Sequence, residues 1–325
     1  MLTDRLPRVS LGFLPTPIHE MPRLSRTLGG PRLFIKRDDQ TGLATGGNKT
    51  RKLEFSAGEA LAQGCDTLVT VGAVQSNHCR QTAAAAARLG LGCHLVLRGF
   101  APERRVGNLL LDALLGATIH FAGERTREEV AAELVEQLRA SGRKPFFVPL
   151  GASDEIGAAG FAAAAEELAG QMQRDDLHFD RVVFATSSGG TQAGLAVGAR
   201  ALGLPAQITG IAIDSKLSEL RAEVTPVAQR LIQRLGLELD FGAEDVLAYD
   251  GYLGAGYAVM GEPEKEAVLL AARCEGILLD PVYTGRAMAG LVDLVRRGEF
   301  TRGETVLFWH TGGAAALDAY EEELA

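Results

Sequence analysis

The sequence predicts an α/β protein built on a parallel sheet with helices on both faces. Short apolar runs alternate along the chain with longer segments whose apolar residues recur at helical spacing. Glycine and alanine are abundant and aromatic residues are few, which favours helices packed closely on a sheet. The length of 325 residues exceeds what one hydrophobic core usually serves, so we expect two lobes.

Proline-rich residues 1–30 predict an extended entry to the fold, since Pro15 and Pro17 push the residues before them away from helical conformations. Strands are expected at residues 32–36, 67–71, 94–97, 118–121, 146–149, 182–186, 208–213 and 305–309. Helices are expected at residues 50–63, 79–89, 106–115, 128–140, 158–169, 192–202, 263–275, 286–297 and 314–322. No long linker interrupts this order, so two domains would be closely joined, with chain crossings near residues 49 and 155.

Composition narrows the function classes. The formal net charge of −8 argues against nucleic acid or an anionic membrane as the main partner. No apolar run approaches the roughly 20 residues that a membrane span needs, and the N-terminus lacks a basic region followed by an apolar run. The four cysteines have no metal-ligand spacing, which favours reduced thiols in a cytoplasmic protein without a metal site.

Lys49 is the first candidate for chemistry. It follows two glycines in the segment GGNKTRKLEF, residues 46–55, and stands at the start of an expected helix. The positive end of a helix dipole favours a depressed amine pKa, and the glycines allow close approach of a ligand. The alternative is a solvated lysine in the first turn of a helix.

A second candidate is the polar row Gln75, Ser76, Asn77 and His78, which lies between an expected strand and helix. Open α/β sheets bind ligands at the carboxyl ends of their strands, and the N–H groups of a helix start can hold a carboxylate. The alternative is an ordinary capping loop, in which Ser76 or Asn77 satisfies helix donors.

A third candidate is the turn SSGGT, which contains Ser188, Gly189, Gly190 and Thr191 between a strand and a helix. Exposed backbone N–H groups and small side chains there allow a phosphate to approach closely. The turn is neither a P-loop nor a dinucleotide-binding G-x-G-x-x-G motif. An ordinary tight turn is the alternative.

Hydroxyl residues mark two more segments at strand-to-helix positions, Tyr283 and Thr284 in DPVYTG and Thr311 in HTGGAAAL. Tyr257 lies in a further glycine-rich bend. Taken individually, half-buried packing with a satisfied hydroxyl is the favoured interpretation of the two tyrosines.

Together these motifs, in this order, resemble the tryptophan-synthase-β-like enzymes that use pyridoxal phosphate (PLP), known as fold type II. The resemblance is strongest to the branch that holds D-cysteine desulfhydrase and 1-aminocyclopropane-1-carboxylate (ACC) deaminase. It implies two domains, each a mostly parallel twisted sheet flanked by helices. The large PLP-binding domain would comprise residues 1–48 and 160–325, and the small mobile domain residues 49–159.

The resemblance also implies residue roles. Lys49 matches the lysine that forms a Schiff base with PLP, Asn77 matches the residue that binds the 3-hydroxyl of the cofactor, and Lys52 matches a basic residue near its phosphate. The implied phosphate cradle is Ser188, Gly189, Gly190 and Thr191. The implied substrate-carboxylate loop is Gln75, Ser76, Asn77 and His78. The implied catalytic residues are Lys49, Ser76, Tyr257 and Tyr283.

Two positions separate the branches. The resemblance implies Glu after the tyrosine of DPVY, and Leu before the C-terminal Gly-Gly, in ACC deaminases. This chain has Thr284 and Thr311 at these positions, as D-cysteine desulfhydrase-like enzymes do. A threonine hydroxyl beside the cofactor ring makes the ring a milder electron sink than a carboxylate would.

The expected reaction is therefore α,β-elimination on a small β-substituted amino acid, first of all D-cysteine to pyruvate, sulfide and ammonia. L-Cysteate sulfo-lyase and ACC deaminase are alternatives, and a non-catalytic PLP-binding protein is an alternative of another class. A sulfonate would need an arginine or a helix N-terminus near the β-carbon, and the sequence does not locate one. A homodimer is the expected assembly.

Overall fold

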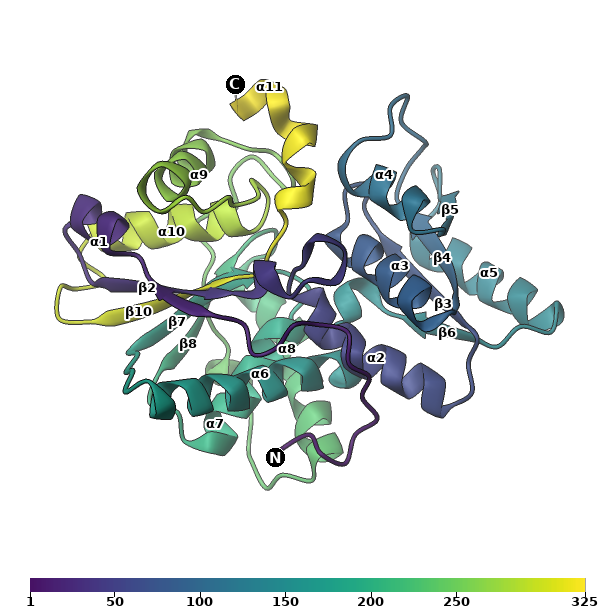
Figure 1. Ribbon diagram of the computed structural model, residues 1–325, viewed down its shortest axis with the longest axis horizontal. Helices are drawn as coiled ribbons and strands as arrows, with labels where there is room; N and C mark the ends of the chain where they lie inside the picture. Colours follow the sequence, from purple (N-terminus) through teal and green to yellow (C-terminus); the bar gives the residue numbers. More distant parts are fainter. Residues whose placement is uncertain (325) are drawn as a thin grey trace.

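The chain folds around two separate sheets, which lie side by side in the computed structural model of residues 1–324 (Figure 1). The larger sheet has six strands. Their order is β1 (Ile18–Glu20), β2 (Arg32–Arg37), β10 (Thr305–His310), β7 (Arg181–Thr186), β8 (Gln207–Ala212) and β9 (Leu247–Tyr249). Only the pairing of β1 with β2 is antiparallel among these described strands.

The smaller sheet is entirely parallel over the described residues. Its order is β5 (Thr118–Phe121), β4 (Gly92–Leu97), β3 (Thr67–Gly72) and β6 (Pro145–Val148). These strands are consecutive in the sequence, which supports the small domain of residues 49–159 that we propose. The remainder, 1–48 and 160–325, would be the large domain, of which residue 325 lies outside the described residues.

Helices cover both faces of both sheets, as predicted. The α-helices are α1 (Pro22–Leu28), α2 (Lys49–Ala62), α3 (Asn77–Leu89), α4 (Gly107–Leu114), α5 (Arg127–Ala140), α6 (Glu155–Arg174), α7 (Gly190–Leu202), α8 (Leu217–Leu235), α9 (Glu262–Glu275), α10 (Thr284–Arg296) and α11 (Glu321–Leu324). Short 3₁₀ helices occupy Asp38–Gln40, Leu43–Thr45, Leu150–Ala152, Ala243–Asp245 and Ala314–Tyr320. None of these described helices is long and apolar enough to cross a membrane.

The core has a separate apolar cluster on each face of each sheet. On the large sheet, residues of α6, α7 and α8 form one cluster, and residues of α1, α9 and α10 form the other. On the small sheet, α2, α3 and α4 supply one cluster and α5 the other. The prediction of an α/β fold with mostly parallel sheets is confirmed.

Among the described strands and α-helices, β1, α1, α8 and β9 were not predicted, and one predicted helix differs. α8 contains Pro226, a residue that normally disfavours a helix interior, and β9 is only three residues long. The segment expected as a helix at 314–322 is instead mostly a 3₁₀ helix. Its start at Gly313 has a φ of 114°, so the chain enters it through a turn rather than a regular helix start.

Glycine and alanine are abundant because the helices approach closely. A Cβ atom at Gly194 of α7 would lie 2.3 Å from the carbonyl oxygen of Ala158 on α6. A Cβ atom at Gly160 of α6 would lie 2.2 Å from the carbonyl oxygen of Arg51 on α2. The second contact seats α2, and with it Lys49, against α6, which packs on the large sheet.

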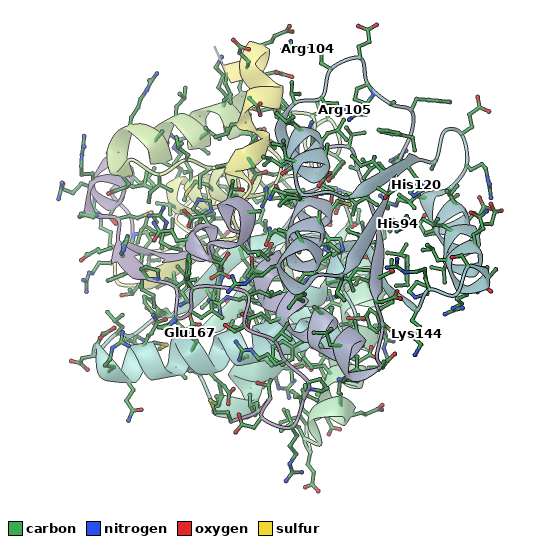
Figure 2. The ribbon with its side chains drawn as sticks, turned by 45° about the vertical axis from the view of Figure 1, so that its right-hand side comes forward. His94, Arg104, Arg105, His120, Lys144 and Glu167 are labelled. Carbon is green, nitrogen blue, oxygen red and sulfur yellow. The ribbon has the colours of Figure 1, made fainter. Side chains whose placement is uncertain are left out.

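A buried charged network fixes the same end of α2. The guanidinium of Arg51 donates to both oxygens of Asp38 at 2.8 and 2.9 Å and to both oxygens of Glu167 at 2.9 Å. Glu167, on α6 (Figure 2), also accepts from the ammonium group of Lys36. Burial opposes ionisation of Glu167, yet Arg51 and Lys36 hold its pKa at about 2. The network ties α2 to β2 and α6.

Candidate active site

A cavity of about 250 Å³ lies where the carboxyl ends of strands from both sheets meet. Segments after β3, β4, β6, β7, β8 and β10 reach it, together with the starts of α2, α3, α5, α7 and α10. This is the position at which parallel α/β sheets bind ligands. The predicted site residues that line it are Lys49, Ser76, Asn77, His78, Ser188, Gly189, Thr191, Tyr257, Tyr283 and Thr311.

Lys49 enters the cavity from the first position of α2. The chain reaches it through Gly47, whose φ of 130° suits glycine and where a Cβ atom would lie 2.4 Å from Gln81 Nε2. The amine donates to Asn48 Oδ1 at 3.0 Å. Burial lowers the pKa of Lys49 to about 8, and Asp280 opposes that shift. At pH 7 about a tenth of this amine is therefore uncharged, far more than for an ordinary lysine with a pKa of about 10.4.

The start of α7 forms one wall of the cavity. Gly189 precedes the helix with a left-handed φ of 79°, and no side chain caps the helix. The N–H of Gly190 donates to the carbonyl oxygen of Ser188 at 3.0 Å, and the other first-turn N–H groups are open to a ligand. Ser188 Oγ lies 2.8 Å from Ser153 Oγ, and Asn48 Nδ2 donates to Thr191 Oγ1 at 3.2 Å.

Lys52 and Gly190 lie directly behind this wall and do not line the cavity. The ammonium group of Lys52 donates to the carbonyl oxygen of Gly151 at 3.0 Å and to Ser153 Oγ at 3.1 Å. A Cβ atom at Gly190 would lie 2.9 Å from that ammonium nitrogen. Burial, assisted by Lys49, lowers the pKa of Lys52 well below its usual value.

The start of α3 forms the facing wall. Ser76 Oγ accepts from the N–H of Cys79 at 3.1 Å, which leaves its own hydrogen available to donate. Asn77 Oδ1 accepts from Arg80 and from Asn108, each at 3.0 Å, so the amide group of Asn77 is oriented. Gln75 does not line the cavity. It binds the chain at Val106 and Asn108 instead, at 3.1 and 2.8 Å.

His78 is buried and neutral. Its Nε2 lies 2.8 Å from Thr70 Oγ1, and that hydroxyl donates to the carbonyl oxygen of Val148 at 2.7 Å. The hydroxyl must therefore accept from His78, which assigns the proton to Nε2. Nδ1 has no protein hydrogen-bond partner among the described residues. Burial, then the charges of Lys49 and Lys52, lower the pKa of His78 well below its usual value.

Two tyrosines, Tyr257 and Tyr283, meet at a further part of the cavity wall. The hydroxyls of Tyr257 and Tyr283 are 2.6 Å apart. Burial and the neighbouring Tyr257 raise the pKa of Tyr283 well above its usual value, and burial also raises the pKa of Tyr257. Both phenols are protonated at neutral pH, so one donates to the other.

The two threonines that divide the family branches are placed differently. Thr311 lines the cavity, and its carbonyl oxygen accepts from the N–H of Asn48 at 2.9 Å. Thr284 is buried and does not line the cavity. Its hydroxyl donates to Asp280 Oδ1 at 2.7 Å. The structure therefore brings only one of these two threonines to the cavity wall.

Sequence reasoning missed several lining residues, among them Asn48, Arg98, Arg127, Ser187 and Asp214. Arg98 directly follows β4, and Asp214 lies two residues beyond β8. The rule that sites form at carboxyl strand ends could have marked both. Arg127 begins α5 and carried no such signal.

Comparison with known proteins agrees with this site. Residues 9–312 match the family model described as pyridoxal-phosphate dependent enzyme. The chain is 44% identical to D-cysteine desulfhydrase of Yersinia enterocolitica and 39% identical to ACC deaminase of Methylobacterium nodulans, with 98% of each chain covered in both cases. A crystal structure of an ACC deaminase homologue, 39% identical, superimposes with a TM-score of 0.92 over 99% of this chain and 97% of that one. The chain therefore belongs to the PLP-dependent enzymes of fold type II.

Proposed function

We propose that the protein catalyses PLP-dependent α,β-elimination on a small β-substituted amino acid, with D-cysteine as the first candidate substrate. The observation that carries this proposal is the convergence of a weakly basic amine, a free serine hydroxyl and a tyrosine pair on one cavity. The relatives named above, a D-cysteine desulfhydrase and an ACC deaminase, support the reaction class.

The residues present fit PLP. The uncapped start of α7, with Ser188, Gly189 and Thr191 on the cavity wall, suits a phosphate. Lys49, with a pKa of about 8, supplies an amine able to hold an aldehyde. Asn77 would bind the ring's 3-hydroxyl. When bound, the cofactor supplies an electron sink for the pair left at Cα.

We assign the remaining steps to the chain's own groups. The Ser76 hydroxyl and the start of α3 bind the substrate carboxylate. Lys49 takes the proton from Cα, because its pKa leaves a free amine near neutral pH. Tyr283 is protonated, is hydrogen-bonded to Tyr257 and lines the cavity, so its hydroxyl can donate a proton to the departing group.

Threonines at positions 284 and 311 favour the desulfhydrase over ACC deaminase. Neither position carries the carboxylate that the resemblance implies for a deaminase. Opening an unactivated cyclopropane demands a stronger electron sink than loss of a sulfur group does. We further propose a cytoplasmic homodimer. The four cysteines are all free thiols, which suits a reducing compartment.

The test is pyruvate release by the PLP-loaded protein, with D-cysteine, L-cysteine and ACC offered side by side. Pyruvate and sulfide from D-cysteine support the proposal. Release of 2-oxobutyrate from ACC as the dominant activity would favour a deaminase instead. The Lys49→Ala variant, expected to lose at least a thousandfold in kcat, is the control for catalysis in this cavity. Size measurement in solution tests the homodimer.

A further inference from the structure

Two arginines line a part of the cavity wall to which the elimination steps assign no role. Arg98 follows β4, and Arg127 begins α5 beyond β5. β4 pairs with β3, whose carboxyl end leads into the Ser76 loop, and β5 pairs with β4. Both arginines therefore lie at the same carboxyl end of the small sheet as the proposed carboxylate loop, which follows β3. Arg98 comes after the neighbouring strand β4, and Arg127 comes after β5, one strand further on.

The charges of both arginines are largely uncommitted. The backbone N–H of Arg98 donates to the carbonyl oxygen of Gly72 at 2.9 Å, which fixes the end of β4. Its side chain has no hydrogen bond or ion pair with any residue of the described chain. Arg127 uses only Nε, which lies 2.9 Å from Oε1 of the exposed Glu128. Such surface pairs stabilise weakly and leave the terminal nitrogens of Arg127 free.

A carboxylate also lines the cavity, after strand β8 of the large sheet, and two serine hydroxyls orient it. Asp214 accepts from Ser187 Oγ at 2.8 Å and from Ser215 Oγ at 3.3 Å. The positive charge of Arg127 acts on Tyr257, which also lines the cavity. Burial raises the pKa of Tyr257, and Arg127 opposes that rise. A cavity wall with the unpaired guanidinium group of Arg98 and the free terminal nitrogens of Arg127 is suited to a second anionic group, in addition to the carboxylate and the phosphate.

We propose that Arg98 and Arg127 bind a negatively charged β-substituent of the substrate, with the sulfonate of cysteate as the best candidate. This proposal rests on the elimination reaction proposed above, but not on D-cysteine as its substrate. In this proposal the two arginines determine which substrates the enzyme accepts, while Lys49 removes the proton from Cα.

The chemistry of the step gives the arginines a catalytic advantage. The Cα–H bond breaks and its proton passes to Lys49, while the Cβ–S bond breaks and its electron pair leaves on sulfur as sulfite. The resulting 2-aminoacrylate is hydrolysed to pyruvate and ammonia. Negative charge on the sulfur group grows from one to two as the bond breaks, so the guanidinium groups stabilise the transition state more than the bound substrate.

The test compares substrates that differ only in the β-substituent. The holoenzyme and its Arg98→Gln and Arg127→Gln variants receive D- and L-cysteate and, as the uncharged reference, β-chloroalanine. We expect kcat/KM for cysteate to fall roughly 10- to 100-fold in each variant, and that for β-chloroalanine to change less than about threefold. Arg104→Gln and Arg105→Gln are matched controls, since these arginines lie on the exposed loop before α4 (Figure 2) and do not line the cavity.

A binding measurement separates this proposal from the proposed function. Changes in the absorbance of the bound cofactor give dissociation constants for cysteate and for alanine, which has no leaving group. Tighter cysteate binding that weakens in the two variants supports the arginine site even if no pyruvate forms. Equal losses for cysteate and β-chloroalanine, or equal affinities for cysteate and alanine, overturn it. Failure of every substrate to yield pyruvate counts against the elimination reaction instead.

Discussion

Single residues of the site show where sequence patterns reach their limit. The motifs located Lys49, Ser76 and Thr191, because each stands at the start of a helix that follows a recognisable loop. The same motifs did not separate residues on the cavity wall from those just behind it. Thr284 follows Tyr283 directly, yet its side chain turns to Asp280. Which side of a helix start faces the cavity depends on tertiary packing, which local sequence does not encode.

The amine of Lys49 should reveal its low pKa during cofactor uptake. Only the uncharged amine attacks an aldehyde, and its pKa of about 8 lies below the usual lysine value of about 10.4. We expect the rate constant for PLP binding to the apo-protein to rise with pH and to level off above about 8. Stopped-flow absorbance across this pH range measures it. A rate that still climbs steeply near pH 10 would contradict the assigned pKa.

Asp112, which does not line the cavity, allows a test of how the free energy of unfolding depends on pH. Its carboxylate is buried, and neither oxygen has a hydrogen-bond partner among the described residues. Burial raises the pKa of Asp112 to about 7, against the weaker opposing effect of Arg80. The folded state binds the proton more tightly than the unfolded state does, so the free energy of unfolding should fall as pH rises from about 4 to about 7.

Asp112→Asn should remove this component and raise the free energy of unfolding at pH 8 by a few kcal/mol. Denaturant melts at pH 5 and pH 8 measure both proteins. The exposed Asp175→Asn is the control, for which no gain at pH 8 is expected. A variant less stable than the parent at pH 8 would show that the carboxylate is stabilised by interactions that burial alone does not reveal.

At the scale of elements, close helix packing explains the composition that the sequence displays. Gly194 lets α7 approach α6, so Gly194→Ala should overpack this contact and cost about 1–3 kcal/mol of unfolding free energy. A Cβ atom at Gly170, also within α6, would meet no neighbouring atom within 4 Å, so Gly170→Ala should gain about 0.5–1 kcal/mol. Thermal melts of both variants compare the two positions. Equal shifts would show that the α6–α7 contact is not as tight as its geometry indicates.

The buried network around α2 predicts a larger cost. Glu167→Gln removes the charge that Arg51 and Lys36 share, and should cost roughly 3–5 kcal/mol because both cations stay buried. Glu155, also on α6, forms a partly exposed ion pair with Arg230 on α8, and Glu155→Gln should cost at most about 1 kcal/mol. Since the pKa of Glu167 is held at about 2, its contribution should be full above about pH 4.5 and be lost as pH falls toward 2.

Sequence patterns predicted the parallel strands well, because fully buried strands appear as continuous apolar runs bounded by glycine and proline. They failed where local rules are broken. Pro226 lies inside α8, and β9 has too few residues to form a recognisable run. The final segment is mostly a 3₁₀ helix that the chain enters through a positive-φ turn at Gly313, a backbone conformation that only glycine adopts readily.

At the scale of the whole molecule, the cavity joins two sheets that the chain builds separately. Its walls come from the starts of α3 and α5 on one side and of α7 and α10 on the other, so a bound cofactor would contact both. A ligand that binds only the native arrangement stabilises every part that it contacts. Loss of PLP should therefore loosen the smaller sheet relative to the larger one.

We expect hydrogen exchange in residues 67–148 to accelerate on removal of PLP, and exchange in β7 and β10 to change little. The smaller sheet has four strands and fewer helices around it, so it depends more on contacts across the cavity. Mass spectrometry of apo- and holo-protein measures both regions in one experiment. Lys49→Ala, with PLP added, should behave as the apo-protein does if Lys49 anchors the cofactor. Uniform acceleration over both sheets would show instead that they unfold as one cooperative unit, and would argue against a separately mobile small domain.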